Sequence, residues 1–235
     1  GGKGYFVLDV TNPNATPTAS GVPGFDEGNA DLLVKLDRTR GPTEPAPDCT
    51  VLSGAEQTTC LQTVDEDKDI GYITARPVRD DADAMRSTQI TRMNNNRWAV
   101  VMGNGYNSKN QRPVLLIQYL DGAKELLKLP TAVPVPAGAG AGAGNGLSTP
   151  RLIDFNGDGL VDVAYAGDQL GQLWKFDLSS ARPSDWGVAA PGRPIFVAED
   201  PQGRRQPITA APVWLPHPYG GVMLGLGTGR LLTLG

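Results

Sequence analysis

Residues 208–213 read Ile-Thr-Ala-Ala-Pro-Val, and nearly the same pattern occurs at residues 73–78 as Ile-Thr-Ala-Arg-Pro-Val. A looser copy, Leu-Ser-Thr-Pro-Arg-Leu, occupies residues 147–152, and the prolines of successive copies lie 73 and then 62 residues apart. After each copy come a turn and an apolar segment that ends in glycine, at 98–103, 161–167 and 222–227. Self-similarity at such intervals is typical of repeat architectures.

Further short apolar segments follow in each repeat and predict a four-stranded antiparallel unit. The expected third strands are residues 114–120, 171–178 and 230–234, and the expected fourth strands are 126–129 and 194–198. At the start of the chain, residues 5–10 match a third strand and residues 32–36 match a fourth. Four antiparallel strands per unit are typical of β-propeller blades, here longer than the usual ~40–50 residues because of loop insertions.

We therefore expect an all-β fold in which residues 1–235 form part of one β-propeller domain. The chain would hold the end of one blade, two whole blades and most of another, which is about three to four blades of a larger propeller. A closed propeller needs at least ~4 blades, so we expect the remaining blades outside this sequence. The chain opens at Gly1 in a strand-like segment, and we interpret it as a portion of a longer protein.

Residues 154–162 read Asp-Phe-Asn-Gly-Asp-Gly-Leu-Val-Asp, which is the spacing of an EF-hand-type calcium loop. Ca²⁺ takes six to eight oxygen ligands at roughly 2.3–2.6 Å, and alternate residues of a tight loop can direct oxygens at one centre. The twelfth position, a bidentate Glu in an EF-hand, is Tyr165 here, so the ninth residue would close the shell. We predict a Ca²⁺ site formed by the side chains of Asp154, Asn156, Asp158 and Asp162 and the carbonyl of Leu160.

In the repeat this loop replaces the turn between the first and second strands of one blade. Residues 93–96 and 215–219 take that position in the neighbouring blades. The alternative is an Asp/Asn/Gly-rich hairpin turn without metal, since these residues also favour positive φ angles. A plain turn does not need three carboxylates, whose mutual repulsion is costly without a cation. We therefore favour a calcium loop in a blade hairpin over a plain turn, and not a helix–loop–helix EF-hand.

Residues 39–69 differ in composition from the repeats and are expected to form a surface insertion. The segment holds both cysteines of the chain, Cys49 and Cys60, and we expect a disulfide between them because so few apolar residues provide little core. Two unrelated thiols or half of a zinc site are the alternatives, but there is no third Cys and the sole histidine, His217, is distant in sequence. A disulfide indicates an oxidising compartment.

Residues 137–146 alternate largely between Ala and Gly, and we expect a linker loop between two blades. The net charge of −4 and the pI near 5.0 do not indicate nucleic-acid binding. No apolar run approaches the roughly 18 residues of a membrane span. We therefore expect neither a nucleic-acid partner nor a membrane span in this chain.

Several separate motifs occur in a defined order, at residues 1–5, 8–11, 69–72, 103–108, 154–162, 165–168 and 173–178. Together they resemble the C-terminal β-propeller of the type IV pilus tip adhesins, the PilC/PilY family. The resemblance covers most of the chain except the cysteine insertion and the Gly/Ala segment.

This resemblance implies a bacterial surface protein at the pilus tip, extracellular after passage through the periplasm, whose propeller binds Ca²⁺ at residues 154–162. It implies that calcium occupancy favours pilus extension and its loss favours retraction, with roles in adhesion and twitching motility. The implied partners are pilus tip components, the minor pilins, and a host or abiotic surface. No catalytic residue and no organic cofactor are implied.

An enzyme is the competing class, because segments such as residues 171–177 are also similar to blades of quinoprotein dehydrogenases, which hold a quinone beside a catalytic Ca²⁺. Such an enzyme needs a base and cofactor-binding groups that converge near the propeller axis, whereas these carboxylates lie in one turn. A calcium-stabilised propeller with an unrelated extracellular role is the third class. We favour the pilus factor and expect no enzymatic activity.

Overall fold

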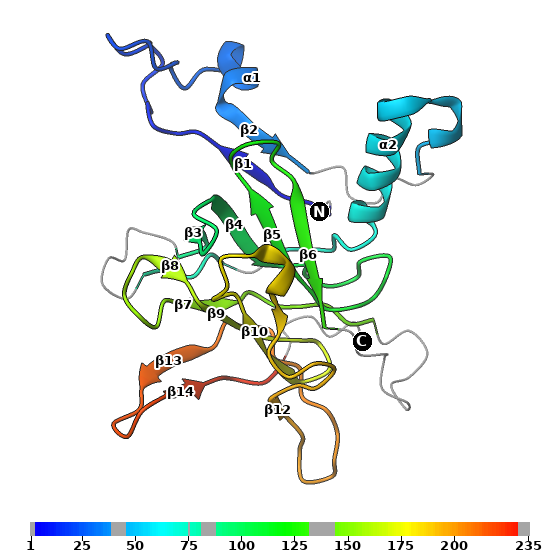
Figure 1. Ribbon diagram of the computed structural model, residues 1–235, viewed down its shortest axis with the longest axis vertical. Coiled ribbons are helices and arrows are strands. Elements are labelled where there is room, and N and C mark those ends of the chain that lie inside the picture. The colour runs from blue at the N-terminus through cyan, green and yellow to red at the C-terminus, as the bar shows by residue number, and fades with distance from the viewer. Residues whose placement is uncertain (1–2, 39–45, 75, 81–87, 132–143, 230–235) are drawn as a thin grey trace.

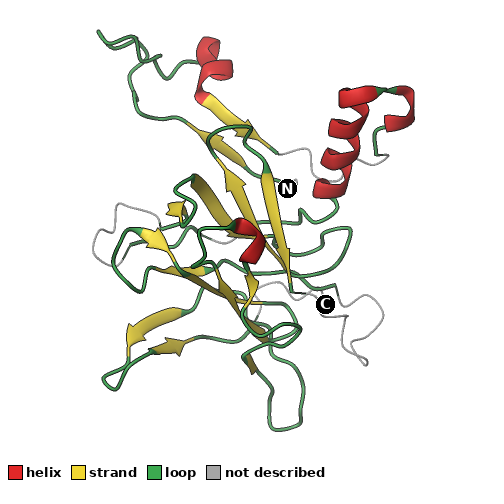
Figure 2. Cartoon of the chain, viewed as in Figure 1, coloured by secondary structure: helices red, strands yellow, loops and turns green. Residues whose placement is uncertain are grey.

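The computed structural model describes residues 3–38, 46–74, 76–80, 88–131 and 144–229. Short strands dominate these residues, and α2 (Gly54–Asp67) is the one long helix among them, as Figure 2 shows. The strands form two larger sheets, with one hairpin before them and one after them along the chain (Figure 1). The all-β class expected from the sequence is confirmed.

The first larger sheet is an antiparallel unit that follows the chain order. Its four antiparallel strands are β3 (Ile90–Met93), β4 (Trp98–Gly103), β5 (Val114–Tyr119) and β6 (Leu126–Pro130), and β8 (Leu160–Val161) joins the edge of the sheet by pairing in parallel with β3. Every residue of β5 is buried, because its alternate side chains enter two different apolar clusters on the two faces of the sheet. A continuous apolar run is what such a doubly covered strand requires.

The second larger sheet repeats this arrangement with a divided outer strand. Its strands are β7 (Arg151–Ile153), β9 (Val163–Gly167), β10 (Gln172–Asp177), β11 (Gly187–Val188) and β12 (Phe196–Val197). β11 pairs with one end of β10 and β12 with the other. The fourth strand predicted at residues 194–198 is therefore present only as β12, and β11 was not predicted.

Two-stranded hairpins flank the larger sheets: β1 (Phe6–Leu8) with β2 (Val34–Asp37), and β13 (Val213–Pro216) with β14 (Val222–Gly225). The strand predicted at residues 32–36 begins only at Val34, because a helical turn starts at the Asp26 cap and continues through η1 (Glu27–Asn29) and α1 (Ala30–Leu33). The third strand expected at residues 230–234 lies outside the described residues.

Apolar clusters join each unit to the next, as in successive blades. The largest cluster packs β3 to β6 of the first larger sheet against the second, where it includes the fully buried Trp174 and Phe176. A second cluster brings Tyr5 of the N-terminal segment against the first larger sheet, and a third packs Tyr165 against Trp214 of the last hairpin. The sheets of the described residues do not close into a ring, as expected for part of a propeller.

Glycines end the second strand of each larger sheet, where the chain of the next blade crosses. A Cβ on Gly103 would lie 2.0 Å from the carbonyl oxygen of Ser148, and one on Gly167 would lie 2.2 Å from Cγ2 of Ile208. Neither glycine has a positive φ. Close approach between blades therefore requires glycine at these two positions, as expected for close-packing residues.

The cysteine insertion folds into η2 (Cys49–Val51) followed by α2, and Cys49 and Cys60 form a disulfide that joins the two. The disulfide expected from the sequence is thus confirmed. The helix was not predicted, because it contains few apolar residues, and Leu61, the largest of them, is 56% exposed. The described part of the insertion, residues 46–69, thus contains regular secondary structure that the sequence did not predict.

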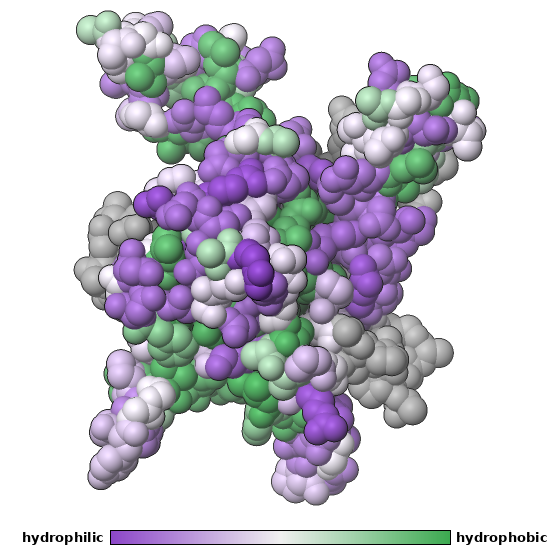
Figure 3. Space-filling model, viewed as in Figure 1, coloured by the Kyte–Doolittle hydropathy of each residue, from purple (hydrophilic) through white to green (hydrophobic). Residues whose placement is uncertain are grey.

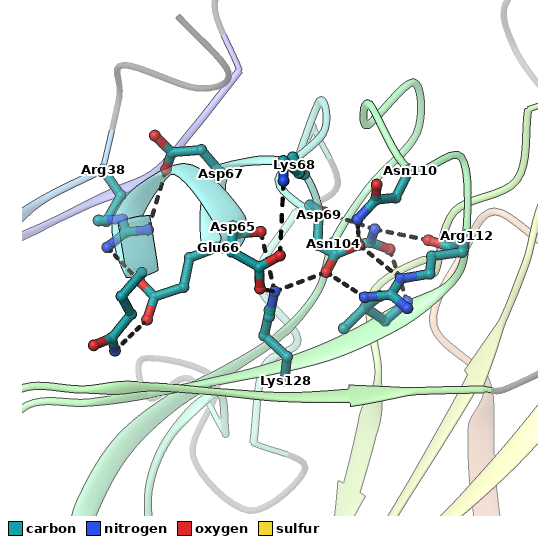
Figure 4. A network of polar contacts seen from close by, with 12 residues as sticks. Arg38, Asp65, Glu66, Asp67, Lys68, Asp69, Asn104, Asn110, Arg112 and Lys128 are labelled. Carbon is teal, nitrogen blue, oxygen red and sulfur yellow. Dashed lines mark hydrogen bonds and ion pairs between the residues drawn. The ribbon is translucent and has the colours of Figure 1, made fainter. Parts of the chain in front are cut away.

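Ion pairs hold the C-terminal end of α2 against the sheets (Figure 4). Arg38, next to β2, pairs with Glu66 and Asp67 at 2.8 and 3.1 Å. Lys128 of β6 pairs with Asp65 at 2.9 Å and with the fully buried Asp69 at 3.0 Å. The insertion is therefore attached to both the first hairpin and the first larger sheet through charge.

Apolar residues reach the surface in more than one place. Figure 3 shows mostly hydrophilic residues in the middle of this face, with apolar residues on the lobe of β1 and β2, where Phe6 is 58% exposed, and again in the lower half of the view. None of the helices in the described ranges combines the length and apolar character needed to cross a membrane. Of the predicted linker at residues 137–146, only residues 144–146 are described.

Candidate metal centre

The predicted calcium loop connects β7 to β9, which pair with each other, so residues 154–162 form a hairpin loop as expected, and β8 (Leu160–Val161) lies within this loop. Asn156 and Asp158 are exposed, Asp154 is half-buried, and Asp162 at the end of the loop is buried. The loop thus offers oxygen atoms to solvent at its tip and is anchored at its C-terminal end.

Main-chain N–H groups of the loop point at its own side-chain oxygens. Asp154 accepts from the N–H groups of Gly157 and Gly159, both at 2.7 Å, through its two carboxylate oxygens. The side-chain oxygen of Asn156 accepts from the main-chain N–H of Asp158. The carboxylate of Asp158 in turn accepts from the N–H of Leu160. These hydrogen bonds, which include Asx turns at Asn156 and Asp158, curl the backbone into a short arc around its own side-chain oxygens.

Positive φ angles at Gly157 (77°) and Gly159 (84°) make the curl possible. L-residues with a Cβ rarely adopt this conformation, so glycine at these positions is a requirement of the backbone. Nothing lies within 4 Å of a Cβ built on either glycine. The glycines are therefore needed for the turn and not for close packing.

Asp162 connects the loop to the strands on both sides. Its N–H donates to the carbonyl of Ile153, and its own carbonyl accepts from the N–H of Leu178. Its carboxylate accepts from the N–H of Phe155 at 2.9 Å through Oδ2. This hydrogen bond ties Asp162, the ninth residue of the loop, to Phe155, the second. The carboxylate predicted to close the calcium shell therefore lies beside the start of the loop.

The donor chemistry of this loop fits a hard cation, since every candidate ligand is an oxygen atom and none is nitrogen or sulfur. Across the described ranges, no group of three or more His, Cys, Asp or Glu side chains is gathered into a metal site. The structure therefore does not gather the three aspartates of the loop into a formed site, and their oxygens accept hydrogen bonds from main-chain N–H groups. The calcium site at Asp154, Asn156, Asp158, Leu160 and Asp162 stays a prediction.

One contact to this loop was missed by sequence reasoning. The side-chain nitrogen of Asn94, in the turn between β3 and β4, donates to the carbonyl of Val161 at 2.8 Å. The three consecutive asparagines at 94–96 mark a turn in the sequence, but nothing there indicates a partner nearly seventy residues away. Only the packing of the two larger sheets brings Asn94 to the loop.

Two other buried carboxylates serve the structure. Burial acts to raise the pKa of Asp69, but hydrogen bonds from Arg112, Asn110 and Lys128 prevail and hold that pKa below its ordinary value. Burial raises the pKa of Asp168, against the effect of the N–H donors around it.

The donors to Asp168 come from the side chains of Trp174 and Asn145 and from the main chain of Leu170 and Gln172. All four contacts are 2.9–3.0 Å long. Asp168 therefore anchors the turn between β9 and β10 and the segment that enters this blade. His217 is half-buried in the hairpin between β13 and β14, with its ring centroid 5.7 Å from that of Tyr219.

Comparison with known proteins gives a consistent result. Residues 60–234 match the family described as the PilY1 beta-propeller domain. The chain is 33% identical over 251 residues to the type IV pilus biogenesis factor PilY1 of Pseudomonas aeruginosa strain PAK, covering 98% of this chain and 16% of that protein. It is 39% identical over 238 residues to a PilY1 homolog of Xylella fastidiosa, covering 98% of this chain and 13% of that protein.

A solved structure gives the same relationship in three dimensions. The crystal structure of the Pseudomonas aeruginosa PilY1 C-terminal domain superposes with a TM-score of 0.58 at 37% identity. The match covers 71% of this chain and 34% of that one. The chain therefore spans a minor part of the length of the proteins that it matches.

Proposed function

Because this chain belongs to the PilY1 β-propeller family, we propose that it is the calcium-binding part of a type IV pilus biogenesis factor. In this proposal Ca²⁺ occupancy of residues 154–162 favours pilus extension and its loss favours retraction. Through pilus number it also affects surface adhesion and twitching motility. The protein acts at the bacterial cell surface, at the tip of the pilus, after passage through the periplasm.

The oxygen-lined hairpin loop between β7 and β9 is the observation that carries this proposal. Its side chains are oxygen donors at the spacing of a calcium loop, and glycines at 157 and 159 give the curl that such a loop needs. The bound cation would neutralise three carboxylates that lie within nine residues of one another. Asp154, Asn156 and Asp158 would bind from the arc, while Asp162 would bind from its anchored position at the base.

The partners follow from the family. The relatives are named as type IV pilus biogenesis factors, so components of the pilus are the partners proposed for this chain, in particular the minor pilins of the tip. A host or abiotic surface is the second proposed partner. The disulfide of the insertion fits an oxidising compartment outside the cytosol.

We propose no enzymatic activity for this chain. The relatives carry names of pilus factors and not of dehydrogenases. Asp69 and Asp168, the buried carboxylates with shifted pKa values, are both surrounded by structural hydrogen bonds. Catalysis by a quinone would need groups that converge on a cofactor, and these two residues do not offer them.

The proposal is tested in cells by replacing one exposed ligand in the full-length pilus factor. Asp158→Ala is the best change, because Asp158 is exposed and its hydrogen bonds stay within the loop. Asp200→Ala is the matched control, since Asp200 also accepts main-chain N–H groups in a turn, at 202 and 204, away from this loop.

We expect surface pilus counts and twitching zones to fall with Asp158→Ala when calcium is plentiful, to the level of cells with the native sequence at limiting calcium. The Asp200→Ala strain should behave like the native strain. Equal piliation of the Asp158→Ala and native strains at every calcium concentration would contradict the proposed regulation.

A further inference from the structure

Asn94 reaches from the first larger sheet to the calcium loop of the second. Its Nδ2 lies 2.8 Å from the carbonyl oxygen of Val161, 3.0 Å from that of Leu178 and 3.4 Å from Oδ1 of Asp162. An amide nitrogen carries two N–H groups, so these are shared among three acceptors. Two of these acceptors lie at the C-terminal end of the loop, in Val161 and Asp162. The third, Leu178, directly follows β10 of the second larger sheet.

The main chain makes a second connection at the same place. β8 pairs in parallel with β3, with Leu160 opposite Arg92 and Val161 opposite Met93. Immediately after Asp162 the chain enters β9, which pairs with β7 and β10 of its own sheet. The two residues before Asp162 thus pair with one blade, and the residues after it pair with the other.

Asp162 is therefore the point at which the chain crosses between blades, and it is also the closing ligand of the proposed calcium site. A carboxylate oxygen can accept a hydrogen bond and still bind a cation, because it has two lone pairs. The Asn94 contact at Oδ1 and the Phe155 contact at Oδ2 restrict rotation of this carboxylate. Groups that orient a ligand in this way affect metal affinity even though they do not touch the metal.

We infer that Asn94 is a positioning residue for the calcium loop, and that calcium binding is coupled through it to the packing of the two blades. This inference rests on the proposed function, since it needs residues 154–162 to bind Ca²⁺. Coupling of this kind is reciprocal: if blade packing favours binding, binding favours blade packing by the same factor. The cation would then stabilise the boundary between two blades and not only a surface loop.

The test compares two neighbouring asparagines of one turn in the full chain. Asn94→Ala removes the contacts to the loop and to Leu178, whereas Asn95→Ala removes a hydrogen bond to Tyr119 of its own sheet at 2.9 Å. We measure Ca²⁺ affinity of both variants by isothermal titration, with Ca²⁺ alone as the ligand. We expect Asn94→Ala to weaken binding by about tenfold, the effect of losing a group that orients a ligand, and Asn95→Ala to leave it unchanged.

A second measurement uses the native chain, so that it does not depend on the folding of a variant. Hydrogen exchange of the peptide that covers β3 and residues 94–96 should slow several-fold when Ca²⁺ is added, while exchange in β13 and β14 should not change. If Ca²⁺ binds the native chain but Asn94→Ala binds it equally well, or β3 exchanges at the same rate with and without Ca²⁺, the coupling is wrong and the loop site stands. If the native chain does not bind Ca²⁺, the proposed function itself fails.

Discussion

Gly103 faces the main chain of Ser148 so closely that a Cβ on the glycine would lie 2.0 Å from the Ser148 carbonyl oxygen. Gly103 ends the second strand of the first larger sheet, and Ser148 precedes the first strand of the second. The contact is between backbones, so no side-chain rotation can relieve it. This position therefore sets how closely the two blades approach.

Gly103→Ala should destabilise the protein by about 2–3 kcal/mol, because an added methyl group must push apart two packed backbones. The free energy of unfolding from denaturant titration measures this effect. Gly187→Ala is the control, since no atom lies within 4 Å of a Cβ at Gly187 and its φ is not positive. Equal stabilities of the two variants would show that the blades can separate at this point without cost.

Asp69 should make the stability of the protein depend on pH in the acid range. Because its pKa is lowered in the folded protein, the stabilisation is fully present above the unfolded pKa of about 3.9 and is lost as the pH falls through the folded pKa. The free energy of unfolding should thus differ between the native chain and Asp69→Asn by a constant amount from pH 7 to about pH 5. Below about pH 4 this difference should shrink.

Asp31→Asn, at an exposed position of α1, is the control for losing one negative charge. Its difference from the native chain should stay small throughout this pH range. A gap between the native chain and Asp69→Asn that persists unchanged to pH 3 would mean that the charge of Asp69 does not stabilise the fold.

The Cys49–Cys60 disulfide should stabilise the insertion without controlling the propeller. The cysteines are 11 residues apart, and closing a loop of that length is worth about 3 kcal/mol of unfolded-state entropy. In a Cys49→Ala, Cys60→Ala double variant, hydrogen exchange should accelerate in η2 and the first half of α2. The C-terminal end of α2 should stay protected by the Arg38 and Lys128 ion pairs.

Exchange in β9 and β10 is the internal control of that experiment, since these strands lie in the second larger sheet, away from the insertion. Their protection should be the same in the double variant and the native chain. Loss of protection in β9 and β10 to the same extent as in α2 would show that the insertion and the propeller unfold together.

The blades were predictable because their signals are local. Apolar strands such as β4, β5 and β10 end at glycines or turns, so their positions follow from short stretches of sequence. The helix α2 was not predictable from hydrophobic periodicity, because ion pairs attach its C-terminal end to the sheets in place of an apolar face. β8 was not predicted as a separate strand, because it exists only through pairing with β3 of another blade.

The candidate site likewise has one part that could be predicted from the sequence and one part that could not. The spacing of residues 154–162 could be read directly, since all of its expected ligands lie within nine consecutive positions. The role of Asn94 could not be predicted from the sequence, because its contacts with Val161 and Asp162 span 67 and 68 residues of the chain. Whether a turn asparagine meets solvent or another blade depends on how the sheets stack.

Calcium titration of the full chain tests the central claim that residues 154–162 form the calcium site. The native chain should bind Ca²⁺ saturably at a single site, and the Asp200→Ala control should bind it equally well. Asp158→Ala should lose affinity by at least about a hundredfold, because one charged oxygen ligand is removed from a small shell. Native-like affinity in Asp158→Ala, or no saturable binding by the native chain, would contradict the account.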